Sequence, residues 1–209
     1  MNLNDLLFQG HLLVFGAGGH GKVVADAALL CGAPALASDR NPVLCHGELL
    51  PGVRLVGVDA VPAEITAVHV AIGNNLWRKR EADFFGHVRL RSVIHPAAVV
   101  AASARLGAGS FVAALAVVAP DASLGVGAIV NHGAIVDHDC TVGAFCHVAP
   151  HATLGGAVRL GQRVLVGSGA VVLPGVEIGD DVVVGGGAVV RHDLREAGTY
   201  VGVPARRIA

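Results

Sequence analysis

The sequence predicts an α/β domain of the Rossmann type followed by a parallel β-helix. Two observations lead to this fold class. A glycine-rich loop joins an apolar run to a helical stretch in the first half, and branched aliphatic residues recur at every sixth position in the second half. The first pattern is typical of Rossmann-like domains, and a strict short repeat is typical of solenoids. We expect the first domain to span residues 1–90 and the second, with a C-terminal cap, residues 91–209.

The predicted elements of the first half alternate between strand and helix. The apolar run 11–15 is expected to be a strand that stops at Gly16, and a helical pattern runs from Lys22 to Leu30. The other expected elements are apolar runs at 35–38, 53–58, 68–72 and 88–94 and a helix from Asn75 to Phe85. This alternation predicts a parallel sheet.

The loop Gly16-Ala17-Gly18-Gly19-His20-Gly21 fits the pattern GxGxxG. Its amides at a helix N-terminus can approach a diphosphate, and Asp39 after the second strand can accept a hydrogen bond from a ribose or a base. The domain is about half the size of a full dinucleotide fold, which favours a mononucleotide or nucleotide sugar. A P-loop is excluded, because Val23 stands where a hydroxyl should bind magnesium. A turn that only packs helix on strand remains an alternative.

The six-residue repeat begins at Ile94 and continues without an insertion to Val190. Every position in this series is valine, isoleucine or leucine, and glycine follows at every third step, as at Gly107 and Gly125. Three hexads therefore make one coil. Each hexad predicts a short strand whose aliphatic side chain points into a narrow core, followed by a tight turn. Stacked coils then pair their strands in parallel around an axial ladder of aliphatic side chains.

Composition and charge exclude several classes of protein. The formal net charge of -1 argues against a nucleic-acid partner, and no apolar run is long enough to span a membrane. The basic run Arg78-Lys79-Arg80 is interpreted as a solvated helix face. The cysteines form no CxxC pair, so we expect free thiols, no bridge between Cys140 and Cys146, and a cytoplasmic protein.

One polar cluster interrupts the apolar hexads. His138 lies between Asp137 and Asp139, directly after the core residue Val136, and His147 directly precedes another core residue. Histidine has an ordinary pKa suited to a general base, and an adjacent carboxylate can orient the ring and raise its basicity. His138 with Asp139 is therefore the candidate catalytic pair.

Five motifs carry a resemblance to a known family over nearly the whole chain. They are the glycine loop, Ala71-Ile72-Gly73-Asn74-Asn75, Asp137-His138-Asp139 with His147, Gly185-Gly186-Gly187-Ala188, and Val201-Gly202-Val203-Pro204-Ala205. In this order they resemble the hexapeptide-repeat sugar-nucleotide N-acetyltransferases. That family includes the UDP-4-amino-sugar acetyltransferase of bacillosamine biosynthesis and the sialic acid O-acetyltransferases.

The resemblance implies a left-handed β-helix and an acetyl-CoA-dependent enzyme without a metal. It implies a homotrimer with active sites at the subunit interfaces, which acetylates an amino group, at C4, of a nucleotide-linked amino sugar. His138 would be the general base, Asp139 the group that tunes it and His147 a donor to the thioester carbonyl. By the same resemblance, backbone contacts to CoA come from Ser168 and Gly186, and the nucleotide sugar is held by Gly18, Gly19, His20, Asp39, Arg40 and Gly73.

Two positions depart from the family pattern, and three other functions stay open. Asp139 stands where the bacillosamine enzyme has glutamate, which shortens the reach of the carboxylate. Arg40 stands where that enzyme has a second aspartate, which leaves the identity of the nucleobase and of the sugar open. The alternatives are O-acetylation of a sugar hydroxyl, a metal enzyme of the γ-carbonic anhydrase type, and a nucleotide-sugar sensor without catalysis. The metal enzyme needs three histidine ligands, and only His138 and His147 are persuasive candidates for such ligands.

Overall fold

A computed structural model describes residues 12–33, 35–62, 65, 67–86 and 89–208. Contacts divide the chain into two compact units, Met1–Pro96 and Ala97–Ala209. The division predicted between residues 90 and 91 lies near this limit. Residues 11 and 88, at which two of the predicted strands begin, lie outside the described residues.

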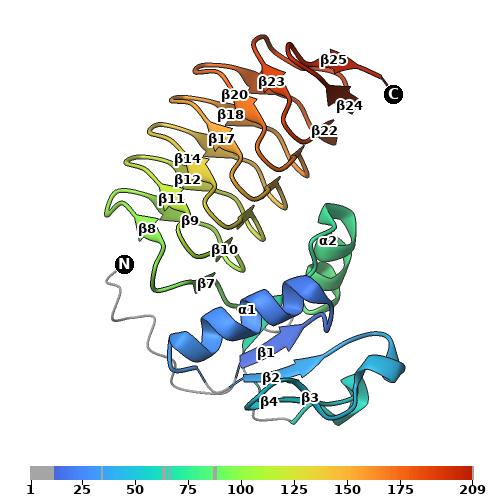
Figure 1. Cartoon of the computed structure of the whole chain (residues 1–209). Helices are drawn as coiled ribbons and strands as arrows, with labels where there is room; N and C mark the ends of the chain where they lie inside the picture. Colours follow the sequence, from blue (N-terminus) through green and yellow to red (C-terminus); the bar gives the residue numbers. More distant parts are fainter. Residues whose placement is uncertain (1–11, 34, 63–64, 66, 87–88, 209) are drawn as a thin grey trace. The chain divides into compact units, whose positions relative to one another are not determined.

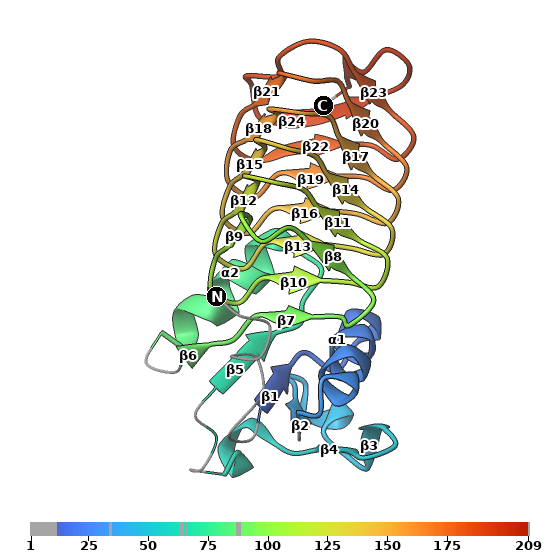
Figure 2. The same cartoon turned by 90° about the vertical axis from the view of Figure 1, so that its left-hand side faces the viewer.

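The first unit contains a mainly parallel six-stranded sheet in the order β3-β4-β2-β1-β5-β6 (Figure 1 labels β1 to β4, and Figure 2 labels all six strands). Only the β3–β4 pair in it is antiparallel. The strands of the unit are β1 (Leu12–Phe15), β2 (Ala35–Ser38), β3 (Glu48–Leu50), β4 (Val53–Leu55), β5 (Ala67–Val70), β6 (Arg89–Leu90) and β7 (Val93–Ile94), and its helices are α1 (Gly19–Leu30), α2 (Asn75–Phe84) and the short 3-10 helices η2 (Pro42–Leu44) and η3 (Val58–Ala60).

Two features of this unit differ from the sequence prediction. The strand β3 was missed, although the turn dipeptide Pro51-Gly52 that joins it to β4 is a hairpin signal. Helix α1 begins at Gly19 rather than Lys22. Glycine has a low helix propensity, but here tertiary packing decides, because a Cβ on Gly21 would overlap the carbonyl oxygen of Gly16. The glycines let the helix start directly against the loop after β1.

The second unit is the predicted left-handed parallel β-helix, which is confirmed (Figure 2). Its three faces are the sheets β8-β11-β14-β17-β20-β23, β9-β12-β15-β18-β21 and β10-β13-β16-β19-β22-β24. The strands are β8 (Val99–Val100), β9 (Arg105–Leu106), β10 (Phe111–Val112), β11 (Val117–Val118), β12 (Ser123–Leu124), β13 (Ile129–Val130), β14 (Ile135–Val136), β15 (Thr141–Val142), β16 (His147–Val148), β17 (Thr153–Leu154), β18 (Arg159–Leu160), β19 (Leu165–Val166), β20 (Val171–Val172), β21 (Glu177–Ile178), β22 (Val182–Val184) and β23 (Val189–Val190).

The strand register follows the eighteen-residue period. Val136 pairs with Val118 on one side and with Leu154 on the other. From Val112 to Val190 every aliphatic residue that recurs at the six-residue period is buried, so these side chains form the axial ladder. Most turns place their second residue in the left-handed region, as at Asp139 with φ 60°. This geometry is typical of type II turns.

The C-terminal segment ends the parallel pairing. Strand β24 (Gly198–Val201) pairs in parallel with β22, and β25 (Arg206–Arg207) returns antiparallel to β24. Cys140 and Cys146 are buried and unbridged, as predicted. No helix in the described part of the chain is long and apolar enough to cross a membrane.

Candidate functional site

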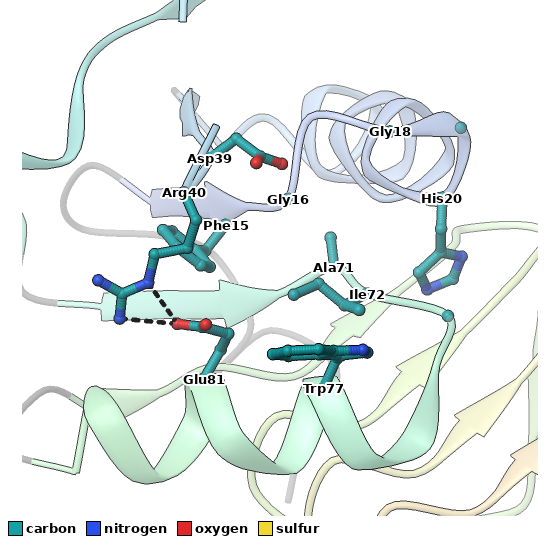
Figure 3. Close-up of a pocket in the computed structure, with 12 residues that line it drawn as sticks. Phe15, Gly16, Gly18, His20, Asp39, Arg40, Ala71, Ile72, Trp77 and Glu81 are labelled. Carbon is teal, nitrogen blue, oxygen red and sulfur yellow. Dashed lines mark hydrogen bonds and ion pairs between the residues drawn. The ribbon is translucent and has the colours of Figure 1, made fainter. Parts of the chain in front are cut away.

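A pocket of about 400 Å³ opens at the carboxyl edge of the parallel sheet in the first unit. Its walls come from the ends of β1, β2 and β5 and from the starts of α1 and α2 (Figure 3). β1 lies between β2 and β5, and the chain after β1 turns to β2 while β5 lies on the other side. This is the topological switch point at which open α/β sheets bind ligands.

The glycine loop forms the anion-binding end of this pocket. Gly18 is the extended N-cap of α1, with no side-chain cap, and the first turn of the helix carries no acidic residue. Backbone amides at such a terminus bind phosphate, because they lack intrahelical partners and the helix dipole is positive there. Gly18, Gly19 and His20 all line the pocket. This end therefore suits a diphosphate.

Asp39 holds the loop in place. One carboxylate oxygen accepts from the backbone amide of Ala17 at 2.8 Å, and the other accepts from the amide of Asn41 at 2.9 Å. The aspartate that the sequence placed as a ligand group therefore also ties the glycine loop to the segment after β2. Each of its oxygens keeps a second lone pair for a ligand.

Arg40 and Glu81 form an ion pair at the other end of the pocket. Both Nε and NH2 of Arg40 donate to Glu81 Oε2, at 3.0 and 2.9 Å. The guanidinium carbon lies 3.9 Å from the ring centre of Phe84, a cation–π contact. The Glu81 side chain is only 8% exposed, whereas Arg40 is half-exposed. The pair holds the Glu81 carboxylate in the wall of the pocket.

Arg78 corrects one sequence interpretation. The basic run predicts a solvated side chain for Arg78, but in the structure this side chain is buried. The guanidinium donates to the carbonyl oxygens of Ile72 and Gly73, at 2.8 and 3.1 Å, and to the side chain of Asn75. These bonds satisfy backbone carbonyls at the turn after β5. Arg78 therefore shapes the wall that Ile72 and Gly73 contribute.

The structure brings all six predicted nucleotide-sugar residues to this one pocket; they are Gly18, Gly19, His20, Asp39, Arg40 and Gly73. Sequence reasoning missed Trp77 and Glu81, which line the pocket from α2. Their four-residue spacing places them on one face of a helix that begins at the carboxyl edge of the sheet. That spacing was the available signal.

In the second unit His138 and Asp139 form a hydrogen-bonded pair on the turn after β14. His138 Nδ1 lies 2.7 Å from Asp139 Oδ2, and both side chains are exposed. The Asp139 hydrogen bond, with the charge of Asp137 as a second cause, raises the pKa of His138. Because Asp139 accepts a hydrogen bond from Nδ1–H, the lone pair of the neutral ring is on Nε2. Nε2 can therefore act as a base.

Gly156, one coil further along, lies against the ring of His138. A Cβ built on Gly156 would lie 2.6 Å from both Cε1 and Nε2 of His138, closer than side chains approach each other. The next residue also links the two coils, because the amide of Ala157 donates to the carbonyl oxygen of His138 at 2.8 Å. The ring position thus depends on the absence of a side chain at residue 156.

His147 lies on β16, on a different face of the helix from β14. Its Nε2 is 3.0 Å from Asn131 Nδ2, and Asn131 Oδ1 accepts from the amide of His132. That second bond fixes the orientation of the Asn131 amide, so Nδ2 must donate to His147. Neutral His147 therefore carries its proton on Nδ1. Asn131, nearly buried, is a second functional candidate that the prediction did not assign.

Ser168 and Gly186 occupy equivalent turns on successive coils. The amide of Gly187 donates to Ser168 O at 2.9 Å, which stacks one turn on the next. The backbone amides of Ser168 and Gly186 themselves donate to no group in the described part of the chain. They are therefore available to a ligand that runs along the coils.

Family models match both units. Residues 11–83 match the PglD N-terminal domain, and residues 157–192 match the bacterial transferase hexapeptide, six repeats. No curated protein sequence gives a significant match. No three histidine, cysteine, aspartate or glutamate side chains among the described residues lie together as a metal-binding group. Fold and matches together define a hexapeptide-repeat transferase.

Solved structures resemble the chain over nearly its whole length. PerB from Caulobacter crescentus, in complex with CoA and GDP-perosamine, is 39% identical with a TM-score of 0.89, covering 97% of this chain and 99% of its own. The acetyltransferase domain of PglB from Neisseria gonorrhoeae FA1090 is 36% identical with a TM-score of 0.90, covering 96% and 100%; it has also been solved with acetyl coenzyme A. WeeI from Acinetobacter baumannii AYE is 26% identical with a TM-score of 0.86, covering 94% and 99%. The chain belongs to the hexapeptide-repeat sugar-nucleotide N-acetyltransferases, an acyltransferase family, as predicted.

Proposed function

We propose that the protein transfers the acetyl group of acetyl-CoA to the amino group, at C4, of a nucleotide-linked amino-deoxy sugar. The amine attacks the thioester carbon, His138 Nε2 takes the amine proton, and the C–S bond breaks to release CoA as a thiolate. The observation that carries this proposal is the 2.7 Å bond between His138 Nδ1 and Asp139 Oδ2. It orients the ring and favours the imidazolium that forms as the proton is taken.

The remaining groups bind the two substrates. The pocket of the first unit holds the nucleotide, with the diphosphate on the amides of Gly18 and Gly19. The amides of Ser168 and Gly186 contact the CoA arm, and His147 donates from Nδ1 to the thioester carbonyl. The tautomer fixed by Asn131 supports this last role. Complexes of the Caulobacter relative with CoA and GDP-perosamine support the pair of substrates.

The protein acts as a cytoplasmic homotrimer in which neighbouring β-helices share the active sites. Ordering both substrates at one site accounts for much of the acceleration, to which base catalysis adds roughly 10²- to 10⁴-fold.

Replacement of the base tests the mechanism. His138→Ala should lower kcat by about 10²- to 10⁴-fold and leave the dissociation constant of acetyl-CoA nearly unchanged. His151→Ala is the matched control, because His151 also occupies a β-helix turn and its ring lies against Gly133. Turnover of His138→Ala within a few-fold of the parent protein would refute the assignment.

A further inference from the structure

Glu81 is a buried carboxylate with one oxygen committed and one available. Oε2 accepts both hydrogen bonds from Arg40. Oε1 has no hydrogen-bond partner among the described residues, although the Glu81 side chain is 92% buried. Figure 3 shows this second oxygen pointing away from Arg40, toward the side of the pocket where Ile72 and Trp77 lie. Oε1 is not among the fully buried polar atoms without a partner; it is the part of this largely buried carboxylate that stays accessible from the pocket, where a ligand can supply a donor.

The charges of the pocket fix the direction of a bound nucleotide. Gly18 and His20 lie at one end of the pocket and Arg40, Phe15 and Glu81 at the other (Figure 3). Phosphates are attracted to the N-terminus of α1, whereas the Arg40–Glu81 ion pair at the other end carries no net charge. A nucleotide with its diphosphate on the glycine loop therefore directs its base toward Glu81. Trp77, whose side chain is half-exposed, supplies flat apolar surface for that base.

The bases differ in what they present to a carboxylate, which is an acceptor only. Guanine carries two adjacent donors, N1–H and the 2-amino group. Uracil and thymine carry a single N3–H flanked by two carbonyl oxygens, which a carboxylate repels. Adenine and cytosine carry an amino group next to a ring nitrogen that is itself an acceptor. Guanine is the base whose donor edge matches a carboxylate without an opposing acceptor.

We propose that Glu81 is the specificity-determining residue of the pocket and that it selects a guanine nucleotide by accepting hydrogen bonds from N1–H and the 2-amino group. Arg40 is the positioning residue: it holds Oε2, neutralises the carboxylate charge and directs Oε1 into the pocket, while its stacking on Phe84 fixes the guanidinium plane. The inference rests on the proposed function, because it names the nucleotide of the sugar substrate.

Calorimetric titration of the full-length protein with GDP, inosine diphosphate, UDP and dTDP tests the proposal. Inosine diphosphate differs from GDP only by the missing 2-amino group. We expect GDP to bind about 10-fold more tightly than inosine diphosphate, as for loss of one hydrogen bond to a charged group, and UDP and dTDP to bind more weakly than both. Glu81→Gln should weaken GDP binding by about 10- to 100-fold and bring the ratio of GDP to inosine diphosphate affinity close to one.

Asp83→Asn is the matched control. It removes the same charge from the same helix, but Asp83 is exposed and pairs with Lys79 outside the pocket, so the parent preferences should persist. The preference of the parent protein among the four diphosphates tests the proposal even if Glu81→Gln fails to fold. UDP or dTDP binding as tightly as GDP, or an unchanged ratio in folded Glu81→Gln, would overturn the role of Glu81 and leave the proposed function intact. Absence of binding by all four diphosphates would overturn both.

Discussion

The contact between Gly156 and His138 predicts how sensitive turnover is to the position of the ring. In Gly156→Ala the new Cβ would lie 2.6 Å from Cε1 and Nε2, whereas ordinary contacts begin at 3.4 Å. The ring must therefore retreat by about 0.8 Å, the difference between these two distances. The backbone at Gly156 is not in the left-handed region, so alanine adds no backbone strain. Displacement of a catalytic group by about 1 Å costs on the order of 10²-fold in rate.

Steady-state thiol release from acetyl-CoA measures this effect. We expect kcat of Gly156→Ala to fall by roughly 10²-fold, while the KM for acetyl-CoA and the thermal unfolding midpoint change little. Gly57→Ala is the control, because a Cβ there meets nothing within 4 Å. A folded Gly156→Ala protein with kcat within twofold of the parent would show that the contact does not position the base.

Three further predictions concern single side chains. Asp139 raises the pKa of His138, and the base must be neutral to take a proton, so kcat/KM should rise with pH through that pKa. Asp139→Asn, whose side chain tolerates the left-handed backbone at this position, should move the acid limb of the kcat/KM profile to lower pH. An unmoved limb would contradict this. Burial lowers the pKa of His69 from 6.5 to about 4, so between these pH values the unfolded chain is protonated at His69 and the folded chain is not. The unfolding free energy should therefore fall by roughly 3 kcal/mol as the pH drops from 6.5 to 4. Urea denaturation of the parent protein and of His69→Asn measures this, and equal pH dependence of the two would refute it. Arg78→Met should lower the unfolding free energy by about 1.5–3 kcal/mol and weaken nucleotide binding, and wild-type values of both would show that Arg78 does not shape the pocket.

The β-helix was predictable because its six-residue period is visible in the sequence as regularly spaced aliphatic residues. Each aliphatic residue of the series from Val112 to Val190 occupies the same position in its hexad and is buried, so one rule describes the whole core. The turn that carries His138 and Asp139 followed from the same rule. The Gly156 contact did not, because it joins residues eighteen positions apart through the orientation of a ring.

The first unit was harder to predict, since tertiary contacts decide its details. Arg78 reads as a surface residue in a basic run, yet carbonyl groups of a neighbouring turn draw it into the interior. Glu81 is one of several charged residues on α2, and only its pairing with Arg40 singles it out. A sequence pattern gives the face of a helix but not the partner that covers it.

Acetyl transfer to the amine of a nucleotide sugar is the reaction that we propose for this protein. Thiol release from acetyl-CoA, measured with GDP-, UDP- and dTDP-linked 4-amino sugars and with their hydroxy counterparts, tests it most directly. We predict release with an amino sugar, faster with the GDP-linked sugar than with the others, and an amide product. Release only with hydroxy sugars, or none with any amino sugar while acetyl-CoA still binds, would contradict it.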